Sequence, residues 1–141
     1  MSLRRISLLC CVAAALAVSL PGAGAEAPAP LPAREAAWRE NNLGVALLEQ
    51  FRFADAVGAF GRALEKDPSL LAARINLAIA QLYVPDIPAA KQAAEEALKA
   101  APLAPQPNYL LALIARSEGR AEEAVPYIRR VLEKDPKDLG A

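Results

Sequence analysis

The feature that most constrains this chain is a repeat with a period of 34 residues. Residues 37–70, 71–104 and 105–138 align end to end without an insertion. We call the three equivalent positions of the aligned units a column. The columns that keep one residue type or size are Leu43, Leu77, Leu111; Gly44, Ala78, Ala112; Ala56, Ala90, Ala124; Leu64, Leu98, Leu132; and Pro68, Pro102, Pro136. Units that repeat at such a period bury their apolar faces by stacking on one another. We therefore expect a stacked array and not a core with a single centre.

The columns have the residue types that a pair of packed helices needs. Small residues such as Gly44 and Ala56 let two helices approach closely, and larger residues such as Phe60 fill the space beside them. A proline such as Pro68 ends a helix, because the residue before proline is pushed out of helical geometry. Gly119 supplies a turn in the middle of the third unit. The sequence therefore predicts an all-α fold of three helix pairs.

This pattern resembles the tetratricopeptide repeat family over residues 37–138 of the 141-residue chain. The first unit is the closest match, with Leu43-Gly44, Ala56, Phe60 and Pro68 at the family's spacing. The family's early Trp and later Tyr are replaced, respectively, by Glu40, Arg74 and Asn108 and by Leu47, Gln81 and Ala115. The resemblance implies three tandem repeats, each a helix, a turn and an antiparallel helix, stacked into a right-handed solenoid.

The resemblance also implies where a partner binds. In this family the first helices of the repeats line a concave groove that holds segments of partner proteins. The corresponding residues here are Trp38, Asn41, Asn42, Val45 and Glu49 in the first repeat, Ile75, Asn76, Ile79 and Tyr83 in the second, and Gln106, Tyr109, Leu113 and Arg116 in the third. The alternative for Ile75 and Leu113 is that they close the core against neighbouring helices.

One subtype of the family grips the acidic carboxy-terminal tails of cytosolic chaperones with Lys, Arg and Asn side chains. The matching positions here are Asn41, Val45, Asn76, Gln106 and Leu110, so the basic members are missing. We therefore exclude that kind of binding.

The composition leaves few options for catalysis. The chain has no His, and both Cys residues lie within the first eleven positions. Zinc sites, thiol catalysis and the serine triad cannot be assembled from the rest. The adjacent carboxylates Glu95-Glu96 and Glu122-Glu123 are an alternative acid and base, but such runs are usually a solvated helix face. We expect no enzyme, no cofactor and no metal, and the balance of 16 basic against 16 acidic residues does not favour nucleic acid as a partner.

The first 25 residues have the pattern of a secretory signal peptide. Arg4 and Arg5 precede the apolar run Ile6–Leu20, and Ala23-Gly24-Ala25 matches a cleavage site. As a helix the run spans about 22 Å, less than the hydrocarbon core of a bilayer that an anchor must cross. We therefore expect cleavage before Glu26, no membrane insertion afterwards, and export to the bacterial cell envelope, either into the periplasm or beyond it.

Residues 26–36 form a proline-rich segment between the leader and the repeats. Pro28, Pro30 and Pro32 stand at alternate positions, which favours an extended polyproline conformation over a helix. We interpret the segment as a short semi-rigid spacer, with a proline-motif ligand as the alternative.

The second helix of the third repeat raises two further expectations. Pro126 falls inside it and predicts a kink or a late helix start. Few residues follow Pro136, so no capping helix is expected to cover the last repeat. We expect Ile128 and Val131 to face inward, and Val125 and Leu132 to lie on the uncovered side, where a partner or a second copy docks. The alternative is that the stems of Arg129, Arg130 and Lys134 cover these apolar side chains.

Together these observations predict a non-catalytic adaptor or chaperone-like module that binds a protein or peptide partner in an envelope assembly. The alternative is a structural subunit that stacks with itself, which makes the protein a homo-oligomer.

Overall fold

The computed structural model describes residues 29–137, so the predicted signal peptide, its cleavage site and both cysteines lie outside the described residues. Within this range the chain forms six α-helices and no strand. The helices are α1 (Leu31–Glu49), α2 (Phe53–Lys66), α3 (Leu71–Tyr83), α4 (Ile87–Ala100), α5 (Pro105–Ser117) and α6 (Ala121–Lys134). The all-α prediction is confirmed, and each predicted unit contributes one helix pair.

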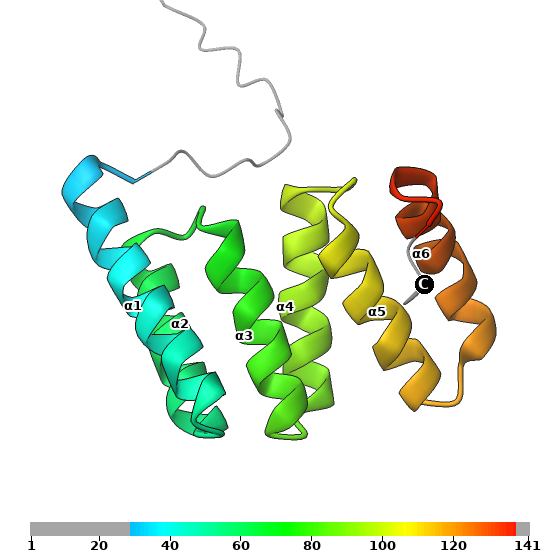
Figure 1. Cartoon of the computed structure of the whole chain (residues 1–141), viewed down its shortest axis with the longest axis horizontal. Helices are drawn as coiled ribbons and strands as arrows, with labels where there is room; N and C mark the ends of the chain where they lie inside the picture. The colour runs from blue at the N-terminus through cyan, green and yellow to red at the C-terminus, as the bar shows by residue number, and fades with distance from the viewer. Residues whose placement is uncertain (1–28, 138–141) are drawn as a thin grey trace, which may run out of the picture.

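The helices form two layers with unequal spacing. Figure 1 shows α1, α3 and α5 side by side, with α2 and α4 behind them. The backbones of α1 and α3, and of α3 and α5, approach each other, whereas α2, α4 and α6 do not approach one another. Because the first helices of the pairs lie closer together than the second helices, the solenoid is concave on the side of α1, α3 and α5.

Prolines end the second helix of every pair, as the sequence predicted. The helices α2, α4 and α6 each end two residues before the repeat proline, and these prolines are Pro68, Pro102 and Pro136. Between helix and proline, Asp67 has φ of −142° and ψ of 91°, which is the extended geometry that a following proline imposes.

Small and large residues are paired between the two helices of the first repeat. Phe60 on α2 is 0% exposed. A Cβ placed on Gly44 of α1 would lie only 2.5 Å from Cε1 of Phe60. Gly44 is therefore required by the close approach of the Phe60 ring, which confirms that the small-residue column is a helix contact.

The expected extended spacer is wrong over residues 31–36, because α1 begins at Leu31. Pro32 lies in the first turn of this helix, where a backbone N–H has no intrahelical acceptor. Its missing N–H therefore costs nothing, and its fixed φ suits the helix. Only residues 29 and 30 of the described segment precede the helix.

A kink or a late helix start was predicted at Pro126; the late start is wrong, and the kink stays a prediction. The helix begins at Ala121 and continues through Pro126 to Lys134. Pro126 is far enough from the amino-terminal end to remove one intrahelical hydrogen bond, the one to the carbonyl of Glu122. The residues on both sides of Pro126 stay helical, so the chain tolerates this loss.

No helix within residues 29–137 has both the length and the hydropathy that crossing a bilayer requires.

Candidate functional site

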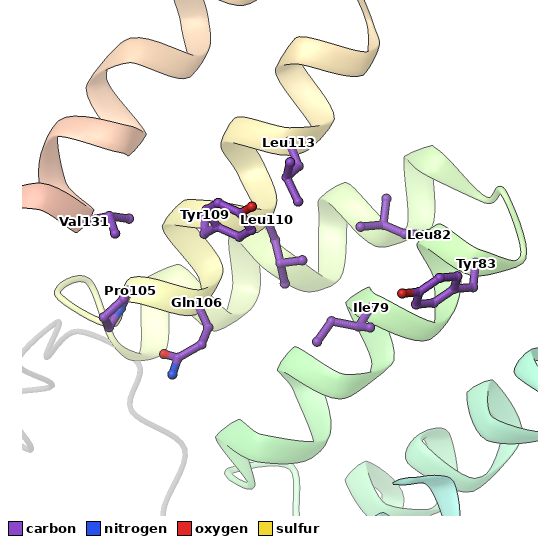
Figure 2. Close-up of a pocket in the computed structure, with 9 residues that line it drawn as sticks. All are labelled: Ile79, Leu82, Tyr83, Pro105, Gln106, Tyr109, Leu110, Leu113 and Val131. Atoms are coloured by element: carbon purple, nitrogen blue, oxygen red, sulfur yellow. The ribbon is translucent and has the colours of Figure 1, made fainter. Parts of the chain in front are cut away.

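The concave side holds a pocket of about 490 Å³ between α3 and α5. Figure 2 shows side chains of α3 facing those of α5 across it. The lining residues are Ile79, Leu82 and Tyr83 of α3, Pro105, Gln106, Tyr109, Leu110 and Leu113 of α5, and Val131 of α6. None of these nine residues carries a formal charge, so the pocket is suited to an uncharged group.

The polar groups of this pocket are few and lie among apolar side chains. They are the hydroxyls of Tyr83 and Tyr109 and the amide of Gln106. Tyr83 is 60% exposed, so its ring forms part of the mouth of the pocket, whereas Leu110 is buried below. The arrangement offers hydrogen bonds at the surface and apolar contact beneath it.

Five of the residues predicted to line the groove meet in this pocket, namely Ile79, Tyr83, Gln106, Tyr109 and Leu113. The predicted groove did not include Leu82, Pro105 and Val131, and Leu110 was named only as a position of the acidic-tail clamp. Leu82 follows Ile79 by three positions, so helical spacing was a usable signal for it. Val131 comes from the second helix of its repeat, and no pattern in the sequence assigns such a residue to the groove.

The prediction that Asn41 lines the groove is wrong. Asn41 was expected to face a partner, but it is only 3% exposed. Its Oδ1 accepts a hydrogen bond of 3.0 Å from Nδ2 of Asn76 on α3, and its own Nδ2 donates to Oδ1 of Asn42 at 3.4 Å. The close approach of α1 and α3 buries this amide, so Asn41 joins two repeats and does not present a binding group.

The remaining predicted groove residues lie outside the pocket. Trp38 is 45% exposed and Val45 is 36% exposed on α1. Ile75 is partly buried and packs against a core cluster that includes Leu110 and Leu111. For Ile75 the alternative of core packing is therefore correct, whereas Leu113 lines the pocket. The other predicted residues outside the pocket and still accessible are Asn42, Glu49, Asn76 and Arg116.

An aromatic cluster lies at the edge of the solenoid beside the pocket. The rings of Phe53 and Tyr83 stack with centroids 4.6 Å apart, and Phe51 meets Phe53 edge-on at 6.2 Å. Phe51 is 79% exposed and has a φ of 59°. The equivalent turn of the third repeat uses Gly119, with a φ of 75°. A bulky residue in this left-handed conformation is strained, and glycine is not.

The outer face of α6 carries the other two predicted site residues, Val125 and Leu132. Both line a shallow groove on that helix, and Val125 is 54% exposed. Val131 is 1% exposed and faces inward, as expected. The expectation for Ile128 is wrong, because Ile128 lines the outer groove. No further helix lies over Ile128 within the described residues, so the face that is inner in α2 is an outer face in α6.

The arginines near α6 do not all cover its apolar side chains. Arg129 lines the outer groove, but the guanidinium of Arg130 lies over the ring of Tyr127, 5.9 Å from its centroid. Val125 stays 54% exposed beside them. The alternative that the stems of Arg129, Arg130 and Lys134 cover these apolar side chains is therefore wrong for Val125.

One carboxylate of each adjacent pair forms an ion pair. Glu96 binds Nη1 of Arg74 at 2.6 Å, and Glu123 binds Nη1 of Arg120 at 2.5 Å. Among residues 29–137, no group of three or more His, Cys, Asp or Glu side chains is placed to hold a metal ion. These carboxylates therefore serve as partners of arginine in the structure.

Comparisons with solved structures show the same fold. The chain is similar to the first tetratricopeptide repeat domain of Spaghetti (RPAP3), bound to the HSP90 peptide SRMEEVD, at 18% identity over 76% of this chain and 85% of that chain, with a TM-score of 0.73. The tetratricopeptide repeat domain of Arabidopsis OM64 matches at 19% identity over 77% of this chain and 89% of that chain, with a TM-score of 0.74. YrrB is described as a tetratricopeptide repeat protein with an unusual peptide-binding site. It matches at 24% identity over 74% of this chain and 54% of that chain, with a TM-score of 0.66.

At these identities the likeness concerns the fold. No curated protein sequence matches the chain. The family model of the tetratricopeptide repeat matches residues 41–84 and 75–138, which together cover more than half of the sequence. The spacing of the columns, the two helix layers and this match agree, and the chain belongs to the tetratricopeptide repeat family.

Proposed function

We propose that this protein is a non-catalytic interaction module whose concave pocket holds an extended, uncharged segment of a partner protein. Tetratricopeptide repeat proteins are protein-interaction modules, and the RPAP3 domain and YrrB are both described with peptide binding. The observation that carries the proposal is the pocket between α3 and α5, whose nine lining residues are all without formal charge.

The chemistry of the pocket defines the segment that fits it. Ile79, Leu110 and Leu113 offer an apolar surface to one aliphatic or aromatic anchor side chain. Burial of such a side chain contributes about 1.5–3 kcal/mol. The hydroxyls of Tyr83 and Tyr109 can each donate and accept a hydrogen bond, so they suit the backbone beside the anchor. The anchor therefore provides the selectivity, and the backbone contacts provide the orientation.

This specificity differs from that of the RPAP3 domain. The peptide bound there, SRMEEVD, carries three carboxylate side chains. The positions that match the acidic-tail clamp here include Val45, Gln106 and Leu110, none of which is basic. The cation of α5, Arg116, lies outside the pocket. We therefore expect an acidic peptide to bind poorly.

A selection from a phage-displayed random peptide library, followed by calorimetric titration of the enriched peptide and of SRMEEVD, tests the proposal. We expect an enriched apolar residue without flanking charge. Leu113→Asn should weaken binding of that peptide at least tenfold, because loss of about 1.4 kcal/mol is a tenfold loss of affinity. Arg116→Ala, on the same helix but outside the pocket, is the matched control and should leave affinity unchanged. Enrichment of acidic peptides that bind Leu113→Asn normally would refute the proposal.

We further propose that the module works as an adaptor or chaperone-like scaffold in the bacterial cell envelope. The support is the signal-peptide pattern of residues 1–25, with its small residues Ala23-Gly24-Ala25. Amino-terminal sequencing of the protein from a periplasmic fraction should give Glu26 as the first residue. A retained leader, or a protein confined to the cytosol, would contradict this location. The expected alternative, a self-stacking subunit, concerns a different surface, the outer face of α6.

A further inference from the structure

The outer face of α6 is an apolar stripe that no other described helix covers. Its residues recur at helical spacing and line a shallow groove of about 400 Å³; they are Ala121, Ala124, Val125, Ile128, Arg129 and Leu132. Among the described helices, only α5 has its backbone beside that of α6. Contiguous apolar surface of this kind marks an interaction site more often than idle exposure.

The same columns in α2 show what such a stripe holds. Ala56 and Phe60 of α2 are 0% exposed. They form one cluster with Ala80 of α3, and Leu77 of α3 packs against that cluster. Ala124 and Ile128 occupy the Ala56 and Phe60 columns on α6 and are only half-buried. The stripe on α6 is therefore equivalent to the surface of α2 that receives the first helix of the next repeat.

The opposite end of the solenoid presents the matching helix. Leu43 and Ala46 of α1 occupy the columns of Leu77 and Ala80. Leu43 is 48% exposed, although Leu111 in the same column is 2% exposed. Figure 1 shows α1 and α6 at opposite ends of the array. One chain thus carries both halves of a repeat junction, in the same register, on two separate surfaces.

We propose that α6 of one copy receives α1 of a second copy, as α2 receives α3 within the chain. The occupant of the stripe is then a second copy of this protein, because its free helix continues a junction that the fold already forms. The two surfaces differ, so the contact is head-to-tail and does not close into a dimer. Each added copy leaves one free stripe and one free α1, and the association extends. This inference does not rest on peptide binding in the concave pocket.

Arg39 limits the strength of this contact. Arg39 occupies the column of Ala73, which is 0% exposed and lies in a cluster with Ala63 of α2. On the free end of the solenoid its guanidinium pairs with Glu35 at 3.5 Å. At the equivalent position of the junction between α2 and α3, Ala73 has only a methyl group. In the junction between two copies, the long side chain of Arg39 therefore has to turn to the margin of the contact. Arg39→Ala should therefore strengthen the association several-fold.

Sedimentation velocity of the mature protein over a range of concentrations tests the proposal. The sedimentation coefficient of the unmodified protein should rise with concentration. Val125→Glu places a carboxylate on the stripe, and Leu43→Glu places one on the outer face of α1. Each variant alone should stay monomeric. A mixture of the two should form a one-to-one dimer and stop there, because the intact stripe of Leu43→Glu receives the intact α1 of Val125→Glu.

The mixture also controls for folding, because only folded partners restore the contact. If circular dichroism shows loss of helix in a Glu variant, Val125→Ser and Leu43→Ser take its place. Three results overturn the proposal. They are a monomeric unmodified protein at every concentration, a mixture that stays monomeric, and self-association retained by Leu43→Glu, which indicates pairing of two α6 helices. Failure of the library peptide to bind leaves all these readouts unaffected, so the two proposals are tested separately.

Discussion

The second helices of the first and third repeats, α2 and α6, carry equivalent columns in different surroundings. Phe60 of α2 is 0% exposed beneath α3, whereas Ile128 in the same column of α6 lines an open groove. Ala56 is likewise 0% exposed, and Ala124 is partly exposed. Burial in a solenoid therefore depends on the junction between two repeats. A column determines which residues can pack together, and the neighbouring repeat determines whether they do.

The largest expected difference between α2 and α6 comes from truncating the large residue of this column. Phe60→Ala should lower the free energy of unfolding by about 3–5 kcal/mol, because it leaves a cavity among Gly44, Ala56 and Ala80. Ile128→Ala should cost only about 1 kcal/mol, because a half-exposed side chain leaves no closed cavity. Urea denaturation followed by circular dichroism measures both. At a concentration where the protein sediments as a monomer, equal losses would mean that the chain itself covers α6.

A smaller difference is expected from adding volume at the alanine column. Ala56→Leu should destabilise the protein by about 1–3 kcal/mol, because the 0% exposed site has no room for a larger side chain. Ala124→Leu, at the same column of α6, should change the stability by less than about 0.5 kcal/mol. Thermal denaturation of the two variants compares them directly. A neutral Ala56→Leu would show that this column is not a helix contact.

Two glycines of the first repeat, Gly44 and Gly61, lie in a tight and an open environment. Gly44→Ala places a Cβ 2.5 Å from Phe60, and the overpacking outweighs the better helix propensity of alanine, for a net loss of about 1 kcal/mol. Gly61→Ala is the matched control within α2, since a Cβ there meets nothing within 4 Å. It should gain about 1 kcal/mol from helix propensity. Changes of the same sign in urea denaturation would contradict the assigned packing.

The smallest effect concerns the turns that connect the helices of each pair. Phe51→Gly should stabilise the protein by about 0.5 kcal/mol, because relief of the left-handed strain at φ of 59° exceeds the entropy cost of glycine. Gly119→Ala, at the equivalent turn with φ of 75°, should have the opposite sign and cost about 1 kcal/mol. Thermal denaturation separates the two. A destabilising Phe51→Gly would show that the contact of Phe51 with Phe53 contributes more than the strain costs.

The repeat frame and most helix ends could be predicted from the sequence, because they depend on local chemistry. A proline such as Pro68 restricts its own backbone and that of the preceding residue, whatever the tertiary structure. The same local rule gave the wrong result at Pro32, because a proline is tolerated in the first turn of a helix. The start of α1 at Leu31 was therefore missed.

The site was predicted less completely, because it depends on which helices meet. The resemblance to the family placed Ile79 and Leu113 correctly in the pocket. It could not show that α1 and α3 approach closely enough to bury Asn41, or that α6 contributes Val131. It also misplaced Ile128, because the column is buried in the other repeats, whereas no helix among the described residues lies over Ile128. These errors arise from tertiary contacts that no single helix specifies.

The buried amide of Asn41 gives the two joints of the first-helix layer different mechanical properties. Between α1 and α3, the hydrogen bond from Asn76 to Asn41 is directional, and a shift that breaks it leaves a buried amide unpaired at a cost of about 1–3 kcal/mol. Between α3 and α5, the same columns hold apolar residues, and Ile75 packs against the cluster that contains Leu110. Apolar contact has no preferred direction, so small sliding movements cost little there. We therefore expect the joint between α1 and α3 to be stiff and the joint between α3 and α5 to be compliant, which lets the pocket walls adjust to anchors of different size while the first repeat keeps its position.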